Sequence, residues 1–463
     1  MKFRRPLSWM LAFCLLALTF MTTLAQEPVP EQDETSGGGV SLLGVEGGAT
    51  IDAILGQTWK NDVVESTDMV GAYSSLAIGP DGGMHVSYYD ETHGDLRYAK
   101  YLGDGSGNCG PNDNWHCITV DDGAGHDVGK YSSIAVHPTT GWPAIAYFDD
   151  TSNDLKYAAY ICFIGCGWFD TVIDDGGIMT AGLHTSIKFT GNGDPVIAYQ
   201  RTHHVLADRL MVAYYVGGTG GTCTYNSWNC DLVDEGVGRG QGISLETTGS
   251  SGKYIAYYDA NAGNLLYAWQ VNPGSGNCLA NNSWKCYTID SAGDVGRFPS
   301  LNYDAGGNKI AYYDATNGKL KLAYFVDSGS DCGGGLPMKC ISMDTIGTGL
   351  TVGGIGLTAV GEDAPVIAYY DSDLQSGSLK VAYPRAFGNC GPIYGSPPIT
   401  WRIWQCDTLD TGFWKLGYNT VGLYASADAN SAGLVSIAYF NETLDNLEVM
   451  YELMGNYLPL LVR

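Results

Sequence analysis

Short runs of alternating apolar and polar residues, separated by turns rich in Gly, Asn and Asp, make up most of this chain. Alternation with a period of two predicts β-strands, because successive side chains of a strand point to opposite faces. The runs recur in a fixed order: an apolar run, a turn, a second run ending in an aromatic pair and usually Asp, a polar turn, and a third run of the Leu-x-Tyr-Ala type. The second runs end at Tyr88-Tyr89-Asp90, Tyr147-Phe148-Asp149, Tyr199-Gln200-Arg201, Tyr257-Tyr258-Asp259, Tyr312-Tyr313-Asp314, Tyr369-Tyr370-Asp371 and Tyr439-Phe440-Asn441. A period of about 58 residues predicts a radial array of small sheets, since one such unit cannot bury both of its faces alone.

A fourth predicted strand lies between successive repeats. In its signature, Trp or Met precedes Cys by two places and an acidic residue ends the strand. It runs from Trp115 to Asp121, Trp228 to Asp234, Trp284 to Asp290, Met338 to Asp344 and Trp404 to Asp410, with an altered copy from Trp168 to Asp174. Four strands per unit are typical of a propeller blade, so we predict an all-β, seven-bladed β-propeller with four-stranded blades. We expect the recurring acidic residues, and the Asp of the aromatic-pair motif, to cap turns by accepting backbone N–H groups.

The last repeat, which ends near Tyr451, lacks a fourth strand. A matching segment with Trp59 and Glu65 instead precedes the first repeat. We expect this N-terminal strand to complete the last blade. Backbone hydrogen bonds would then join the two ends of the ring and leave no open edge.

Twelve of the 13 cysteines fall into pairs, one pair in each connection between a third and a fourth strand. Six local disulfides are the natural expectation for an exported protein. The expected disulfides join Cys109 to Cys117, Cys162 to Cys166, Cys223 to Cys230, Cys278 to Cys286, Cys332 to Cys340 and Cys390 to Cys406. Metal binding is disfavoured, because only one pair has short spacing and no His lies close by in sequence.

The chain begins with basic residues and an apolar run to about Leu24. This pattern predicts a signal peptide over residues 1–25. We assign a flexible acidic and Gly-rich linker to residues 26–55, the propeller to residues 56–453 and a tail to residues 454–463. The Tyr-Leu-Pro-Leu sequence in the tail resembles the ending of many proteins secreted by certain filamentous bacteria. Since no later segment has the roughly 20 apolar residues that span a bilayer, we expect a secreted or cell-surface monomer.

Charge narrows the choice of partners. The chain has 24 Lys and Arg against 49 Asp and Glu, and loss of three basic residues with the signal peptide would leave a net charge of −28. Such a charge opposes phosphate binding, so we expect no nucleic-acid partner.

Departures from the repeat gather on one face. Loops from second to third strands, and from each fourth strand to the next blade, should emerge opposite the disulfides. Cations, histidines and aromatic residues in these loops predict a site for carbohydrate or another extracellular polymer, including anionic ones. The candidate ligand-binding residues are His126, Lys130, Tyr131, His184, Arg201, His203, His204, Arg239, Arg297 and Trp414, with Tyr73 and Phe298 beside them. We predict no cofactor, although the loop from Asp121 to Asp127 has the composition, without the ligand spacing, of a calcium loop.

Two phrases, Ile310 to Tyr324 and Ser74 to Gly82, resemble repeats of secreted bacterial seven-bladed β-propellers, a loose group that includes lectin-like and sialidase-like rings. The resemblance implies a fold and leaves the activity open, because similar blades bind sugars, cleave glycans or only mediate contacts. The Ser-x-Asp-x-Gly-x-Thr-Trp box of sialidases is absent from the sequence, and no catalytic residue is carried over.

Three functions follow as hypotheses. The first is a non-catalytic binding protein for carbohydrate or another extracellular polymer. The second is a polysaccharide-degrading enzyme, a lyase or glycoside hydrolase, that acts on an anionic glycan. In a lyase, an arginine would neutralise a uronate and a histidine or tyrosine would move the proton, with candidates Arg201, Arg239, Arg297, His184, His203 and Tyr131. The third is a structural or adhesion protein.

Overall fold

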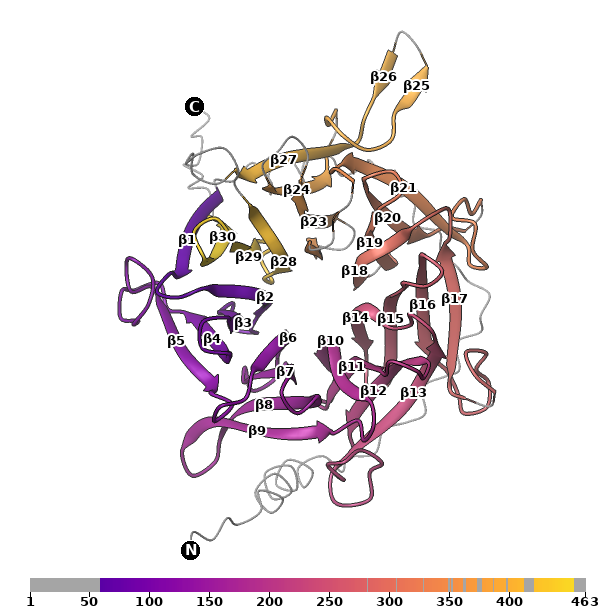
Figure 1. Cartoon of the computed structure of the whole chain (residues 1–463). Coiled ribbons are helices and arrows are strands. Elements are labelled where there is room, and N and C mark those ends of the chain that lie inside the picture. The colour runs from indigo at the N-terminus through magenta and orange to yellow at the C-terminus, as the bar shows by residue number, and fades with distance from the viewer. Residues whose placement is uncertain are drawn as a thin grey trace, which may run out of the picture.

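The computed structural model describes residues 59–453 except 281, 305, 328, 349, 351–352, 361–363, 373–376, 386, 397–398 and 412–419. Seven sheets of four antiparallel strands stand around a central axis, which confirms the predicted seven-bladed β-propeller (Figure 1). The predicted signal peptide, linker and tail lie outside the described residues. Within the described part of the chain, no helix has the length and apolar character needed to cross a membrane.

Each of the first six blades takes its four strands in chain order, from the axis to the rim (Figure 1). Blade 1 contains β2 (Val70–Ile78), β3 (Met84–Asp90), β4 (Asp95–Tyr101) and β5 (Trp115–Asp121). Blade 2 contains β6 (Val128–Val136), β7 (Pro143–Asp149), β8 (Asp154–Cys162) and β9 (Cys166–Asp174). Blade 3 contains β10 (Thr180–Phe189), β11 (Pro195–Thr202), β12 (Asp208–Tyr215) and β13 (Trp228–Gly236). Blade 4 contains β14 (Gln241–Thr248), β15 (Gly252–Asp259), β16 (Asn264–Gln270) and β17 (Trp284–Asp290).

The remaining blades follow the same plan, and blade 7 draws on both ends of the chain. Blade 5 contains β18 (Val295–Asp304), β19 (Gly307–Asp314), β20 (Lys319–Phe325) and β21 (Met338–Thr345). Blade 6 contains β22 (Ile355–Val360), β23 (Ala364–Asp371), β24 (Ser378–Pro384) and β27 (Trp404–Asp410), with a side hairpin of β25 (Tyr394–Ser396) and β26 (Ile399–Trp401). Blade 7 contains β28 (Val421–Ala429), β29 (Val435–Asn441), β30 (Asn446–Glu452) and β1 (Trp59–Glu65).

The second strands form the core of the blades. β3, β7, β23 and β29 are buried at every position, because neighbouring blades cover both of their faces. The first tyrosine of each aromatic pair is fully buried, as Tyr88, Tyr147, Tyr199, Tyr257, Tyr312, Tyr369 and Tyr439. The aromatic repeat therefore supplies large side chains that fill the space between blades.

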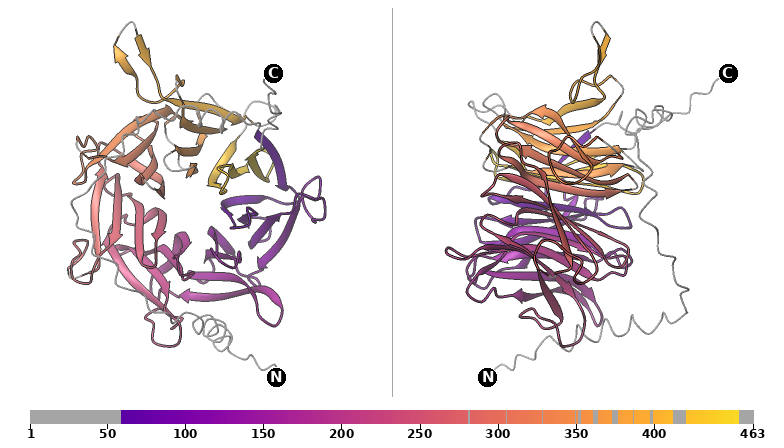
Figure 2. Two further views of the ribbon diagram at one scale, coloured as in Figure 1. Left: turned by 180° about the vertical axis from the view of Figure 1, so that it is seen from behind. Right: turned by 90° about the vertical axis from the view of Figure 1, so that its right-hand side faces the viewer.

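The predicted closure of the ring is confirmed. β1 pairs antiparallel with β30, and Trp59 lies opposite Glu452 in this register. Val64 is fully buried and belongs to the same core cluster as Trp115 of blade 1. The N-terminal strand thus completes blade 7 and forms part of its contact with blade 1, as the indigo strand beside the yellow blade shows (Figure 2).

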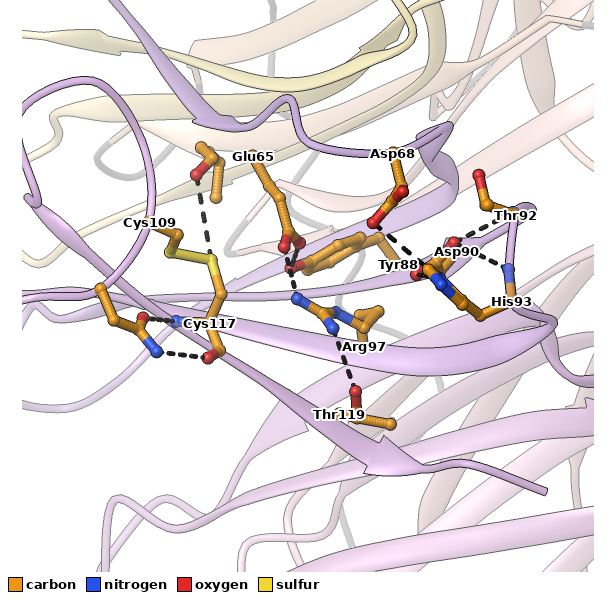
Figure 3. A network of polar contacts seen from close by, with 12 residues as sticks. Glu65, Asp68, Tyr88, Asp90, Thr92, His93, Arg97, Cys109, Cys117 and Thr119 are labelled. Carbon is orange, nitrogen blue, oxygen red and sulfur yellow. Dashed lines mark hydrogen bonds and ion pairs between the residues drawn. A yellow bond between two sulfur atoms is a disulfide. The ribbon is translucent and has the colours of Figure 1, made fainter. Parts of the chain in front are cut away.

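A carboxylate and a buried tyrosine join every pair of neighbouring blades. In the first of these contacts, which we call clasps, Glu65 accepts hydrogen bonds from Tyr88 and Arg97 (Figure 3). The seven carboxylate–tyrosine pairs are Glu65–Tyr88, Asp121–Tyr147, Asp174–Tyr199, Asp234–Tyr257, Asp290–Tyr312, Asp344–Tyr369 and Asp410–Tyr439. In six clasps a cation pairs with the carboxylate, as Arg97, Lys156, Arg201, Arg239, Lys321 and Lys380.

Turn capping is therefore only part of what the acidic residues at the strand ends do. Asp121 accepts the N–H of Gly123 at 3.0 Å, as expected, and also binds Tyr147 Oη at 2.7 Å and Lys156 Nζ. Burial alone would raise the pKa of the Asp121 carboxyl, but hydrogen bonds from Lys156 and Tyr147 outweigh it and hold the pKa below its ordinary value. The turn-capping role expected of the aromatic-pair Asp is confirmed at Asp90, which accepts two N–H groups of the following turn.

The contact between blades 6 and 7 departs from this plan. Glu448 stands in place of the cation, and Tyr439 Oη lies 2.8 Å from carboxylate oxygens of both Asp410 and Glu448. Asn61 and Asn441 each donate a side-chain N–H to Glu448 at 2.8 Å. Asn61 belongs to β1, so this hydrogen bond also ties the N-terminal strand into blade 7.

All six predicted disulfides are confirmed, each between the expected partners. They join Cys109 to Cys117, Cys162 to Cys166, Cys223 to Cys230, Cys278 to Cys286, Cys332 to Cys340 and Cys390 to Cys406. Five of these disulfides join cysteines 7 to 16 residues apart, whereas the disulfide of blade 2 spans only 4 residues. The local spacing means that each disulfide staples one hairpin rather than joining two blades.

Candidate functional site

Aromatic side chains gather around the axis near the start of the first strands, on the face opposite the disulfide loops. They line an open depression of about 270 Å³, just below the range of about 300–1,000 Å³ for ligand pockets. We call them the axial aromatic cluster, which consists of Tyr73, Tyr131, His184, Phe298 and Tyr424. Centroids lie 4.8 Å apart for Tyr73 and Tyr131, 4.9 Å for Tyr73 and Tyr424, and 4.6 Å for Tyr131 and His184.

A strained backbone presents each member of the cluster. All five residues have φ between 52° and 54°, a left-handed conformation that costs a non-glycine residue about 1–2 kcal/mol. The conformation belongs to a bulge in the first strand, where the register shifts between Ala72 and Ser75 in blade 1. Blade 4 has Gly242 at the same position with φ 52°, so the fold accepts glycine there. Aromatic residues at a strained position that suits glycine make this position a candidate functional site.

Serine side chains hold the bulges in place around the axis. Two residues after the aromatic position, Ser75 Oγ accepts the N–H of Ile134 at 3.2 Å, and Ser133 Oγ accepts the N–H of Ile187 at 3.1 Å. The same contact recurs between other neighbouring blades, with Ser186, Ser244, Ser300 and Ser426 as acceptors. The first strands are thereby linked side by side, which fixes the positions of the aromatic side chains.

The cluster carries no charge at neutral pH. Burial raises the pKa of Tyr73 far above its ordinary value and that of Tyr424 to about 12. Burial also raises the pKa of Tyr131, and it lowers the pKa of His184 to about 4. The depression therefore offers phenol hydroxyls, one neutral imidazole and aromatic faces. These groups suit the hydroxyls and apolar faces of a sugar better than an anionic group.

Two of the residues predicted from the sequence, Tyr131 and His184, meet in this cluster. Lys130 and Arg297 directly precede cluster residues, and both are paired with acidic side chains. Lys130 Nζ lies 2.7 Å from Asp127 and 2.5 Å from Asp150. Arg297 lies 2.5 Å from Asp294.

The other predicted residues that the structure describes do not line the axial depression. Arg201 belongs to the clasp of Asp174, and Arg239 lies between two carboxylates at 3.3 and 3.4 Å. His126 lies 3.3 Å from Asp149. His203 and His204 contact each other, with ring centroids 4.3 Å apart. Trp414 lies outside the described residues. Paired with carboxylates, the predicted cations have less attraction left for an anionic ligand.

Sequence reasoning missed Tyr424 as a member of the site. The signal was present, because Val421-Gly422-Leu423-Tyr424-Ala425-Ser426 repeats the order Val70-Gly71-Ala72-Tyr73-Ser74-Ser75. Aligning these phrases would have shown that one position is aromatic in five of the seven blades.

One group of metal-ligating side chains occurs among the described residues. Asp68, Asp90 and His93 place ligand atoms within 4.8 Å of one another (Figure 3). Asp90 already binds two turn N–H groups and lies 2.8 Å from His93 Nδ1. The hydrogen bond with Asp90 raises the pKa of His93, which favours the protonated imidazole that donates and does not coordinate. The carboxylates of the Asp121–Asp127 loop that resembled a calcium loop also have partners, since Asp121 forms a clasp and Asp127 binds Lys130 and Tyr89.

The fold and the axial cluster define a seven-bladed β-propeller with an uncharged aromatic site on its axis. No protein-family model and no curated protein sequence matches the chain. Among solved structures it is similar to the Hadza microbial sialidase Hz136, with 10% identity, coverage of 85% of this chain and 68% of that one, and a TM-score of 0.46. It is also similar to the fucose-specific lectin from Aleuria aurantia, with 12% identity, coverage of 76% and 99%, and a TM-score of 0.42.

A third similar structure is the polysaccharide lyase Uly1, with 9% identity, coverage of 82% of this chain and 89% of that one, and a TM-score of 0.42. The resemblance to lectin-like and sialidase-like rings is thus one of fold alone. At these identities it carries no argument about activity.

Proposed function

We propose that this chain is an extracellular, non-catalytic carbohydrate-binding protein whose axial aromatic cluster binds a sugar unit. The observation that carries the proposal is the presence of aromatic side chains in five blades at a strained backbone position that glycine occupies in blade 4. The apolar face of a sugar ring packs on such side chains, and its hydroxyls exchange hydrogen bonds with Tyr73, Tyr131 and His184. Six disulfides support an extracellular location, because they persist in oxidising environments.

A neutral glycan fits this site better than an anionic one. The depression has neutral side chains, and the protein around it has a formal net charge of −25. The lyase hypothesis needs an arginine that can neutralise a uronate. Arg201, Arg239 and Arg297 each pair with a carboxylate, so no observation favours that hypothesis over binding.

Replacing Tyr131 by glycine tests the proposal. The substitution removes one face of the cluster and restores the residue that blade 4 already has at this position. We expect affinity for the glycan that the wild type binds on a glycan array to fall about tenfold or more. The melting temperature should change by no more than about 3 °C, because relief of backbone strain offsets the lost packing.

Tyr303→Ala is the matched control, since Tyr303 is 43% exposed and lies outside the cluster. It should bind like the wild type. Equal affinities of Tyr131→Gly, Tyr303→Ala and the wild type would contradict the proposal, as would a wild type that binds no glycan on an array of neutral and acidic structures.

A further inference from the structure

Blade 2 has a shorter outer hairpin than the five other blades whose third and fourth strands lie in one continuous segment of the chain. In blade 1, 13 residues separate the last residue of β4 from Trp115, whereas in blade 2 β8 ends at Cys162 and β9 begins at Cys166. The disulfide-bearing loops of five other blades pack into the seam with the preceding blade. Their cysteines belong to, or pack against, the core clusters of those seams. The cluster between blades 1 and 2 contains no cysteine among the described residues.

Specific contacts show how the longer loops cover their seams. Tyr225 of blade 3 donates its N–H to Ile173 of blade 2 at 3.1 Å, and Gly391 of blade 6 donates to Met343 of blade 5 at 2.7 Å. In blade 4, the Asn282 side chain donates to the carbonyl of Val233 in blade 3 at 3.1 Å. The short hairpin of blade 2 leaves the corresponding seam with blade 1 uncovered.

The uncovered seam is a groove of about 600 Å³ between blades 1 and 2. Its walls include Tyr98 and Lys100 of blade 1 and Trp142, Tyr160 and Trp168 of blade 2. Tyr98 and Trp168 are in contact, with ring centroids 4.9 Å apart. Trp168 is partly exposed, whereas the tryptophans at the same position of four other blades, Trp115, Trp228, Trp284 and Trp404, are no more than 2% exposed.

A buried histidine without a full set of partners borders the groove. His85 is 2% exposed, and its Nδ1 lies 2.6 Å from Tyr98 Oη. Its Nε2 is buried and has no hydrogen-bond partner among the described residues. Burial lowers the pKa of His85 to about 4, so the ring is neutral at pH 7 and Nε2 can take part in one hydrogen bond. The equivalent residue in blade 2 is Ala144, which shows that the propeller does not need a histidine here.

A glycine leaves space beside this nitrogen. A β-carbon on Gly79 would lie 2.7 Å from Asp81 Oδ1 and 3.4 Å from His85 Nε2. A side chain at Gly79 would therefore contact His85 and displace Asp81, whose Oδ1 also accepts the N–H of Gly83 at 3.0 Å. Lys100 also lines the groove, where the hydrogen bond from Gly83 and the Lys100 charge both lower the pKa of the Asp81 carboxyl. Aromatic walls with one carboxylate, one ammonium and one neutral imidazole match the apolar faces and the donor and acceptor hydroxyls of a saccharide.

We propose that the groove between blades 1 and 2 is a second carbohydrate site, which binds a neutral oligosaccharide between Trp142 and Trp168 with a hydroxyl at His85 and Asp81. The groove borders the loops from first to second strands, at the opposite ends of the first strands from the axial cluster. The two sites are separate, so one molecule can hold two glycan chains. Neither site depends on the other being occupied.

Isothermal titration with cellohexaose, xylohexaose, mannohexaose and chitohexaose tests the second site on the full chain with its disulfides formed. Trp142→Ala removes one wall. Gly79→Ala places a methyl group against His85 Nε2 and displaces the Asp81 carboxylate, at a backbone conformation that alanine accepts. We expect each variant to weaken one binding event about tenfold or more and to leave binding at the axial cluster unchanged. Thermal melting identifies any variant that fails to fold.

Phe163→Ala is the matched control, because Phe163 is 61% exposed at the tip of the same hairpin and does not line the groove. Loss of binding in both groove variants, with wild-type binding by Phe163→Ala, supports the second site. Tyr131→Gly separates the two proposals, since it should weaken only the axial event. The second site is overturned if Trp142→Ala binds every hexasaccharide like the wild type, if Tyr131→Gly abolishes all binding, or if no hexasaccharide binds.

Discussion

A chain that begins at Ser66, and so lacks β1, is expected to show no cooperative thermal unfolding and to aggregate during purification. The deletion removes the fully buried Val64, whose burial contributes about 1.5–3 kcal/mol. It also removes Glu65 and leaves Tyr88 and Arg97 without their acceptor, at a cost of about 3–5 kcal/mol. These losses together match the stability of many whole domains, which is about 5–15 kcal/mol. The open edge of β30 would in addition be free to pair with other chains.

A chain that begins at Trp59 is the control for this deletion, since it keeps β1 and lacks only the residues before it. Circular dichroism melting and size-exclusion chromatography compare the two. The control should unfold cooperatively as a monomer. A monomeric chain beginning at Ser66 that melts within about 5 °C of the control would show that β1 is dispensable and that the ring closes in another way.

Asp121→Ala should lower the free energy of unfolding by about 3–5 kcal/mol, because the substitution leaves the buried Tyr147 hydroxyl and the Lys156 ammonium without their shared acceptor. The adjacent Asp122→Ala is the matched control. Asp122 is exposed and accepts only a turn N–H in the described structure, so its replacement should cost less than about 1 kcal/mol. Chemical denaturation of the three proteins measures both values.

The pH dependence of the same comparison tests the role of the Asp121 charge. Because the folded-state pKa lies below the ordinary value of 3.8, the carboxylate stabilises the fold above that pH. Its contribution is lost as the pH falls through the lowered pKa. The difference in stability between wild type and Asp121→Ala should therefore be constant from neutral pH down to about 5 and shrink below 4. A difference under 1 kcal/mol at pH 7 would contradict the clasp.

The repeat allowed most of the fold to be predicted from the sequence. The alternation of apolar residues, the Trp-x-Cys signature and the displaced copy at Trp59 are local patterns, and they were sufficient for the blades, the closure and the six disulfides. The clasps were not predicted, because the partners of Asp121 lie in the next blade, 26 and 35 residues away. A carboxylate at a strand end looks the same in sequence whether it caps a turn or also binds a neighbouring blade.

The candidate sites were less predictable for two physical reasons. Cations in loops looked available for ligands, but their carboxylate partners, such as Asp294 for Arg297, became clear only in three dimensions. The groove between blades 1 and 2 arises from a short loop. It can be recognised only by comparison with other blades, in which longer loops cover the corresponding seam. The altered copy at Trp168 was visible in the sequence, whereas the space that it leaves was not.

We propose that glycans bind at two places, a repeated aromatic position on the axis and a groove left by the short hairpin of blade 2. The most direct test is a glycan array probed with the wild type and with the double variant that combines Tyr131→Gly and Trp142→Ala. The comparison requires that the melting temperatures of the two proteins lie within about 5 °C of each other. The wild type should bind neutral glycans, and the double variant should bind each of them about tenfold or more weakly than the wild type. Wild-type signals from the folded double variant would contradict this proposal.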